Sequence, residues 1–88
     1  MRMPDKNIVL TVIVNGTPTE VGADPNQPLG SIVPVALQQT GNSGQPPGNW
    51  ELKDGLGNLL DLNKKIGDYN FPANTKLFLS LKAGVGGV

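Results

Sequence analysis

The alternation of apolar and polar residues near the N-terminus predicts a β-hairpin. Residues 7–14 are rich in β-branched side chains, which favour strands. Asn15-Gly16 follows, the preferred pair for a two-residue type I′ turn, because both central positions need φ > 0. Residues 17–21 would then return as the second strand, with Val14 opposite Thr17. In this register the more apolar face is assigned to the core and carries Ile8, Leu10, Val12, Val14, Thr17, Thr19 and Val21.

A helix is expected next, beginning at Leu29 or Ser31 and ending at Thr40. Its apolar residues recur at three- and four-residue spacing and form one stripe. They are Leu29, Ile32, Val33, Ala36 and Leu37. With Ser31 as the N-cap, Pro34 falls in the first turn, where its missing N–H would have had no partner within the helix. Gly41 then occupies the left-handed position that ends many helices.

Two loops and three short segments complete the middle of the chain. Residues 22–28 and 41–49 are predicted to be loops because they are rich in glycine, proline and polar residues. Residues 50–53 alternate apolar and polar side chains, as a half-buried strand does, and residues 59–62 are interpreted as a short apolar strand. Residues 64–71 are turn-rich. Their expected anchors are Ile66 and either Tyr69 or Phe71.

The final strand is predicted over residues 76–82. Leu77, Leu79 and Leu81 lie on one face, and the other face carries Lys76, Phe78, Ser80 and Lys82. Because the first and last strands are both strongly apolar on one face, they are expected to pair at the centre beneath the helix. The fold class is therefore α+β, a mixed sheet of four to five strands with one helix packed across it. We expect one domain over residues 7–82, between a disordered N-terminus at 1–6 and a flexible tail at 83–88.

Composition removes several classes of function. The 88 residues carry seven basic and seven acidic side chains, a net charge of zero that argues against a nucleic-acid partner. Cysteine and histidine are absent, so thiolate or imidazole metal sites, a thiol nucleophile and a histidine base are excluded. We expect neither a cofactor nor enzymatic activity. The start is polar and the apolar run at 8–14 is too short to span a bilayer, so a cytoplasmic protein without a membrane partner is expected.

Four short motifs, in order, resemble ubiquitin and its relatives, the β-grasp modifiers. Asp-Pro-Asn-Gln-Pro-Leu at 24–29 resembles the Glu-Pro-Ser-Asp-Thr-Ile run that leads into the helix of ubiquitin. Gly-Asp-Tyr-Asn-Phe at 67–71 resembles its Ser-Asp-Tyr-Asn-Ile, and 75–82 resembles its leucine-rich last strand. Gly86-Gly87 matches its terminal diglycine. Together the motifs extend the resemblance over roughly residues 7–87.

This resemblance implies a protein modifier. Gly86 and Gly87 would form the end that is attached to a target, and Val88, which follows them, implies a precursor trimmed by a protease. The implied partners are an ATP-dependent activating enzyme, a conjugating enzyme, a processing or deconjugating protease and a target protein. The scarcity of lysine and the loop at 41–49 resemble bacterial ubiquitin-like proteins, which are encoded beside conjugation enzymes and often lie in antiviral defence islands.

The positions that match the apolar receptor patch of ubiquitin carry Lys53 and Ser80, so its usual receptors are not expected as partners. Phe78 lies on the polar face of the last strand and is as consistent with an exposed contact as with packing. The candidate contact residues are Phe78, Ser80, Lys82 and Lys53. Two other functions stay open: a sulfur carrier ending in a thiocarboxylate, and a β-grasp binding module that never uses its tail. Self-association through an uncovered strand edge is also open.

Overall fold

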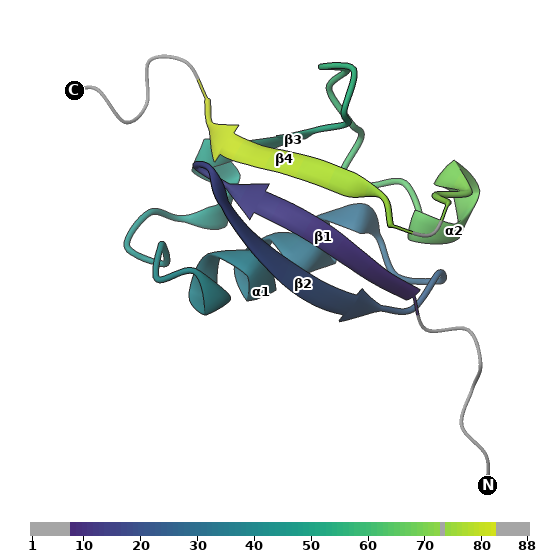
Figure 1. Cartoon of the computed structure of the whole chain (residues 1–88), viewed down its shortest axis with the longest axis horizontal. Helices are drawn as coiled ribbons and strands as arrows, with labels where there is room; N and C mark the ends of the chain where they lie inside the picture. The colour runs from purple at the N-terminus through teal and green to yellow at the C-terminus, as the bar shows by residue number, and fades with distance from the viewer. Residues whose placement is uncertain (1–7, 73, 83–88) are drawn as a thin grey trace, which may run out of the picture.

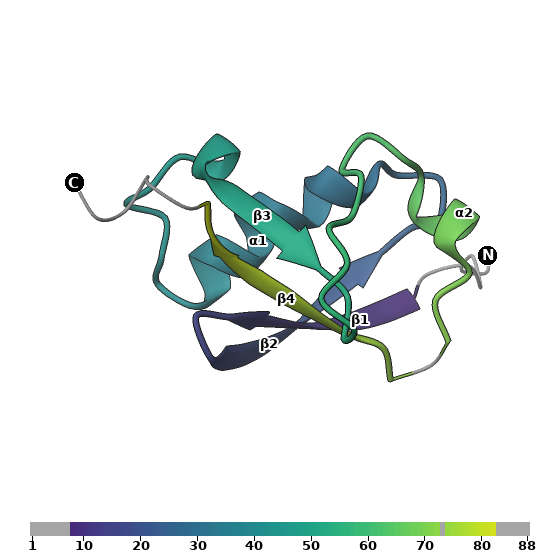
Figure 2. The same cartoon turned by 90° about the horizontal axis from the view of Figure 1, so that it is seen from above.

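The computed structural model describes residues 8–72 and 74–82. They form a four-stranded sheet with strand order β2-β1-β4-β3, crossed on one face by the main helix (Figures 1 and 2). In chain order the elements are β1 (Ile8–Val14), β2 (Thr17–Ala23), the 3₁₀ turn η1 (Leu29–Ser31), α1 (Ile32–Gln39), the 3₁₀ turn η2 (Pro47–Asn49), β3 (Trp50–Lys53), α2 (Ile66–Tyr69) and β4 (Lys76–Leu81). The predicted N-terminus at 1–6 and tail at 83–88 lie outside the described residues.

The hairpin forms in the predicted register. Val14 pairs with Thr17, and Asn15 and Gly16 have φ of 49° and 86°, as a two-residue turn with left-handed central residues requires. β2 is longer than predicted, since Gly22 and Ala23 belong to the strand rather than to the following loop. Ala23 pairs with Ile8 and is only 3% exposed. Burial of Ala23 in the core therefore continues the strand past Gly22, where the sequence predicts a loop.

The first and last strands pair at the centre of the sheet, as predicted. β1 and β4 run parallel, with Val12 beside Leu77, and β3 pairs antiparallel with the other side of β4. The expected short strand at 59–62 is wrong, because Leu59 makes only a single bridge to Lys53. The chain then turns toward η1, where the Gly30 N–H donates to the carbonyl of Leu62 at 2.8 Å. The sheet therefore has four strands.

The helix begins through a 3₁₀ turn rather than through a side-chain cap. Ser31 is the N-cap residue of α1, as predicted, but it has helical backbone angles and its side chain makes no capping bond: its hydroxyl donates to the carbonyl of Pro28 at 2.8 Å. Pro34 is the third residue of α1 and lies in the first turn, as predicted. Gly41, at φ 75°, ends the helix as expected. Its N–H donates to the carbonyl of Gln38, and the N–H of the next residue donates to the carbonyl of Leu37, which is the hydrogen bonding of a Schellman motif.

The core lies between α1 and the face of the sheet that it covers (Figure 2). All five residues of the predicted helical stripe are buried, as are Leu10, Val12, Val14 and Val21 of the hairpin. Thr17, which the pattern placed on the same face, is exposed because it lies at the turn. Trp50 is 1% exposed, so this aromatic is a core residue. Leu77 and Leu79 supply the contribution of β4 to the core.

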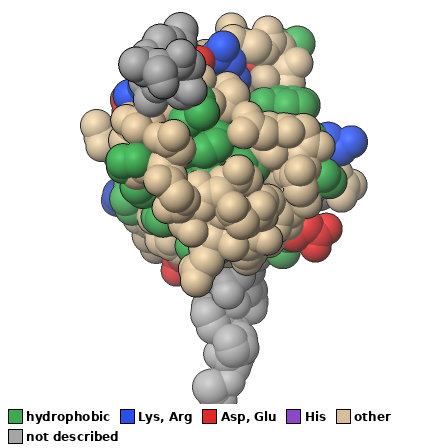
Figure 3. All heavy atoms as spheres, turned by 90° about the vertical axis from the view of Figure 1, so that its left-hand side faces the viewer, with side chains coloured by type: hydrophobic (Ala, Val, Ile, Leu, Met, Phe, Trp, Pro, Cys, Tyr) green, Lys and Arg blue, Asp and Glu red, His purple; other side chains and the backbone are tan. Residues whose placement is uncertain are grey.

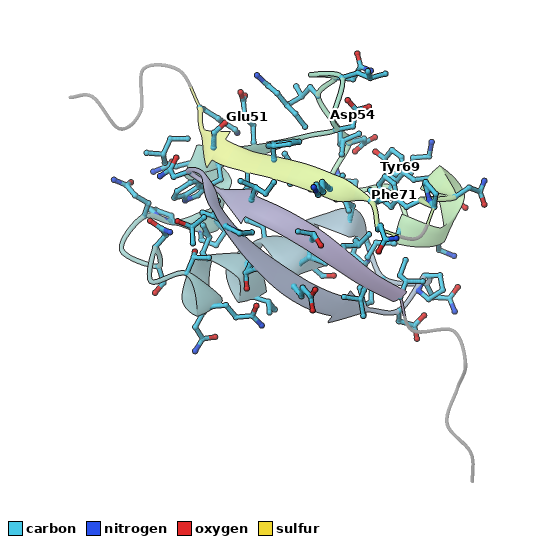
Figure 4. The ribbon with its side chains drawn as sticks, viewed as in Figure 1. Glu51, Asp54, Tyr69 and Phe71 are labelled. Carbon is cyan, nitrogen blue, oxygen red and sulfur yellow. The ribbon has the colours of Figure 1, made fainter. Side chains whose placement is uncertain are left out.

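The segment after β3 is held by the anchors that the sequence indicates. Ile66 is fully buried at the start of α2, a single helical turn that the turn-rich composition did not predict. The Tyr69 hydroxyl donates to the carbonyl of Asp61 at 2.9 Å and accepts the N–H of the same residue at 2.7 Å. The Tyr69 and Phe71 rings stack with centroids 5.0 Å apart (Figure 4). Both predicted aromatic anchors are therefore used.

Gly67 is required for α2 to approach the loop before the main helix. Its N–H donates to the carbonyl of Pro25 at 2.8 Å, and a Cβ added at Gly67 would lie 2.9 Å from the Pro25 Cβ. We expect Gly67→Ala to lower the free energy of unfolding by about 1–3 kcal/mol through overpacking. Denaturant unfolding measures this, with Gly55→Ala as the control, because nothing lies within 4 Å of a Cβ at Gly55. Equal stability of the two variants would contradict the prediction.

Candidate functional site

The last strand delivers the C-terminal residues to one end of the sheet. Leu81 pairs with Trp50, and the Lys82 N–H donates to the carbonyl of Asn49 at 2.8 Å. Figure 4 places Glu51 beside the same end of β4, where the chain continues toward its C-terminus. The predicted attachment residues Gly86 and Gly87, and the removed Val88, lie outside the described residues. The structure thus fixes the point from which the tail starts, at Lys82.

Most of the candidate contact residues lie on the face of the sheet opposite α1, which we call the open face. Figure 1 looks onto this face, with α1 behind the strands. Phe78 is 40% exposed and lies directly opposite Lys53 of β3. Ser80 follows two residues further along β4 and is half-buried beside Glu51. Lys82 lies beyond the end of β4, at the start of the tail. The structure therefore brings Lys53, Phe78 and Ser80 together.

Charge on the open face is partly paired. Among residues 8–72 and 74–82, the one ion pair joins the Lys53 Nζ to the Glu51 Oε2 at 3.3 Å. Lys76 and Glu20 also lie on this face, on either side of Thr11 in the strand register. Both side chains are exposed. A partly exposed ion pair such as Lys53–Glu51 contributes little to stability.

Asp54 shapes the turn after β3 through hydrogen bonds within that turn. Its Oδ1 accepts the N–H groups of Leu56 and Asn58 at 2.9 Å each, and its Oδ2 accepts the Asn58 side-chain amide at 3.2 Å. The backbone N–H of Asn58 is the main cause that lowers the pKa of Asp54 below its ordinary value of 3.8. This is the turn chemistry expected of Asp before glycine.

A pH experiment tests the role of Asp54. Because the folded-state pKa is lowered, the carboxylate stabilises the fold above its ordinary pKa, and this stabilisation is lost as pH falls through the folded-state value. Asp54→Asn should therefore be less stable than the wild type at neutral pH and equally stable in strong acid. Denaturant unfolding at both pH values checks this. A difference between the two proteins that persists in strong acid would contradict the assignment to charge.

The sequence pattern did not select the apolar residues of β1 and β2 as contact residues. Val9 is 58% exposed. On the open face Ile13 lies between Phe78 of β4 and Pro18 of β2. The sequence pattern could have identified them, because the alternation of the hairpin already places these residues on the face that points away from the core. Leu56, 87% exposed in the Asp54 turn, and Leu59, 65% exposed, were also not singled out as exposed. The open face is consequently more apolar than the final strand alone indicates.

Residues 8–72 and 74–82 hold no group of three or more acidic, histidine or cysteine side chains able to bind a metal. None of the described helices is long and apolar enough to cross a membrane. The end of the molecule in Figure 3, where β4 finishes, shows mainly uncharged side chains and backbone around a hydrophobic centre. The open face and the start of the tail therefore remain the candidate site.

Comparison with solved structures gives the fold. A designed protein based on ubiquitin matches with a TM-score of 0.74 and 17% identity, over 97% of this chain and all of that one. A ubiquitin from Caldiarchaeum subterraneum matches with a TM-score of 0.71, also at 17% identity, over 91% of this chain and 99% of that one. At such low identity the likeness establishes the architecture alone. The fold is a ubiquitin-like β-grasp, as the sequence resemblance predicted.

Sequence comparison gives the family. The uncharacterized protein y4jI of Sinorhizobium fredii is 56% identical over 80 residues, which cover 91% of this chain. These residues span only 62% of the length of that relative. A family model described as "Protein of Unknown function (DUF2604)" matches residues 3–87, from near the N-terminus through the diglycine. The chain therefore belongs to the DUF2604 family, and its fold is that of ubiquitin.

Proposed function

We propose that the chain is a ubiquitin-like protein modifier, trimmed after Gly87 and then joined through Gly87 to a target protein. The observation that carries the proposal is the position of the diglycine behind a ubiquitin-like body. The last strand ends at the edge of the molecule, and Gly86-Gly87 follows Lys82 after Ala83, Gly84 and Val85. Ubiquitin-like architecture and diglycine therefore occur in the arrangement that conjugation requires.

To be conjugated, the tail must be long enough to reach an enzyme active site and narrow enough to enter it. Five residues from Ala83 to Gly87 can span at most about 17 Å, at roughly 3.3–3.6 Å per residue. This length carries a terminal carboxylate from the folded body into an enzyme cleft. Glycine has no Cβ and tolerates unusual backbone angles, so Gly86-Gly87 fits where larger residues would clash. The side chains of Ala83 and Val85 are small enough to follow.

In this proposal the chain is a substrate and its partners supply the catalysis. A protease hydrolyses the Gly87–Val88 peptide bond. An activating enzyme then joins the Gly87 carboxylate to the AMP part of ATP with release of pyrophosphate, and acyl transfer by a conjugating enzyme releases AMP. The product is an isopeptide bond to an amine of the target. A cytoplasmic setting supplies the ATP. A relative that is 56% identical comes from Sinorhizobium fredii, so we propose a bacterial setting for this pathway, and we place the pathway in antiviral defence.

The test uses intact mass. The full chain and a form ending at Gly87 are incubated with ATP and the activating and conjugating enzymes encoded beside the gene. Covalent attachment of the Gly87 form to a protein supports the modifier. Exchange of one oxygen for sulfur supports the alternative, a sulfur carrier, which the diglycine also fits but the trailing Val88 disfavours. If both forms stay unmodified while partners still bind, the chain is a non-conjugated binding module and the proposal fails.

A further inference from the structure

We infer that the C-terminal tail, residues 83–88, folds back onto its own domain and places the Val85 side chain in an apolar hollow at the outer edge of β3. β3 is an edge strand of the sheet, and the hollow lies between it and residues 59–62. Its volume is about 170 Å³, and its apolar walls are Trp50, Leu52, Leu59, Leu60 and Leu62. The inference goes beyond the proposed attachment chemistry, because it concerns where the tail is held before any enzyme binds it.

The hollow exists because the chain that follows β3 pairs with its outer edge only briefly. The Leu60 N–H donates to the carbonyl of Leu52 at 2.9 Å. After that bond the chain is held away from β3, because the Tyr69 hydroxyl takes up both backbone groups of Asp61. The carbonyl of Leu62 accepts a hydrogen bond from η1 at 2.8 Å. The backbone groups that would have continued the sheet are therefore used elsewhere, and a gap is left beside β3.

Two backbone groups of β3 face this gap without a partner. The bond from the Lys82 N–H to the Asn49 carbonyl sets the alternation of the β3–β4 ladder, so Trp50 and Leu52 direct their backbone groups away from β4. The Trp50 N–H bonds within η2, and the Leu52 carbonyl accepts the bond described above. Within residues 8–72 and 74–82 no backbone bond uses the Trp50 carbonyl or the Leu52 N–H. An extended segment beside β3 can bond to both groups.

The indole of Trp50 adds a third polar group without a partner. Trp50 is 1% exposed and lines the hollow, and its Nε1 has no hydrogen-bond partner among the residues that the structure describes. Buried polar side-chain atoms are nearly always hydrogen-bonded, so this N–H indicates that an acceptor is missing. A peptide carbonyl is such an acceptor. Apolar walls together with unpaired donors and an unpaired carbonyl favour a peptide with an apolar side chain as the occupant.

The tail is the peptide segment that begins at the hollow. Lys82, from which the tail starts, is itself one of the residues that line it. The residues from Ala83 to Val85 span at most about 10–11 Å, and two strand spacings of about 4.8 Å separate β4 from the outer edge of β3. Gly84 has no Cβ and allows the chain to reverse its direction. A short tether also gives the tail an effective concentration in the millimolar range, which favours it over a separate peptide.

Size and distance select Val85 as the residue that enters the hollow. An apolar cavity of about 150 Å³ holds a benzene molecule, so the hollow has room for a valine side chain. Ala83 directly follows Lys82 and is too close to it to reach across β3. Val88 lies three residues beyond Val85, and closing the longer loop costs more entropy. If the tail is conjugated as proposed, it must leave the hollow before activation, and this consequence alone rests on the proposed function.

Amide hydrogen exchange of the full chain, followed by NMR, tests the docking of the tail. The Leu52 N–H should exchange at least tenfold more slowly in the wild type than in Val85→Ser, because the docked tail supplies its acceptor. The N–H groups of Glu51 and Lys53 bond to β4 and should exchange equally in both proteins, which shows that the sheet is intact. Val88→Ser is the matched control and should exchange like the wild type. Equal effects of the two valine substitutions would overturn the inference.

A second pair of variants tests the wall of the hollow. Leu59 is 65% exposed, so Leu59→Ser removes part of the wall and no buried core residue. It should speed exchange at Leu52 as Val85→Ser does, whereas Leu56→Ser, in the same loop but outside the hollow, should not. Unchanged exchange at Leu52 in Val85→Ser would overturn the inference. So would protection that rises with protein concentration, because the tail of a second copy would then occupy the hollow. No enzyme enters these measurements, so docking of the tail and its attachment to a target are judged separately.

Discussion

Leu77→Ala is expected to lower the free energy of unfolding by about 3–5 kcal/mol and to leave a large fraction of the protein unfolded. Leu77 is fully buried in β4, one of the two central strands, beside Val12 of β1. Leucine-to-alanine changes in such positions remove transfer free energy and leave a cavity. A domain of this size has a thin core, and its total stability lies near the lower end of the range, about 5 kcal/mol.

Denaturant unfolding followed by circular dichroism measures the loss. Lys76→Ala is the control, because Lys76 precedes Leu77 on the same strand and is exposed on the open face. It should change stability by less than about 0.5 kcal/mol. If the two variants were equally stable, β4 would not be central to the core, and the position of the strand that leads to the tail would be wrong.

Local periodicity was sufficient to predict much of the fold. In β1 and β4, β-branched and leucine residues alternate with outward residues, so Leu10, Val12, Leu77 and Leu79 could be assigned to the core before their partners were known. Asn15-Gly16 also defined the hairpin register, because its turn accommodates only two residues. These predictions succeeded because the local preference and the tertiary environment favour the same structure.

The errors arose where tertiary contacts decided the structure. Gly22 and Ala23 have weak strand propensity, yet pairing with β1 holds them in β2. Leu59 and Leu60 have the composition of a strand, but the Leu60 N–H donates to Leu52 and the chain then leaves the sheet toward η1. Ser31 is the N-cap residue, but its hydroxyl bonds to Pro28 before the 3₁₀ turn instead of capping α1. For β2 and Leu60 the deciding partner lies in another strand, whereas for Ser31 it lies three residues away.

The residues of the candidate site also differ in how far the sequence alone could identify them. Phe78 could be singled out from its own strand, because an aromatic side chain among polar residues is anomalous on one face. Ile13 and Pro18 could be placed on one outward face from the hairpin register, but the pairing of Ile13 with Phe78 depends on the parallel register of β1 with β4. The attachment residues are the opposite case. Gly86 and Gly87 were proposed for attachment from the sequence alone, and they lie outside the described residues.

The largest functional effect is expected at Gly87. With the processing protease omitted, the full chain should form no adduct in the presence of the activating enzyme, whereas the form ending at Gly87 should react. Gly87→Ala, made in the form that ends at residue 87, should reduce adduct formation by at least a hundredfold, because a Cβ would enter the narrowest part of the enzyme cleft. Intact mass measured over time gives the rates of both forms.

The control for this experiment is thermal unfolding of the same proteins. Among the described residues the buried core extends from Leu10 to Leu79. We expect removal of Val88 and Gly87→Ala to leave the melting temperature unchanged within error. Loss of reaction with an unchanged melting temperature assigns the effect to the tail. If the full chain reacted as fast as the trimmed form, trimming would be no part of the pathway. If Gly87→Ala reacted normally, attachment through this glycine would be excluded.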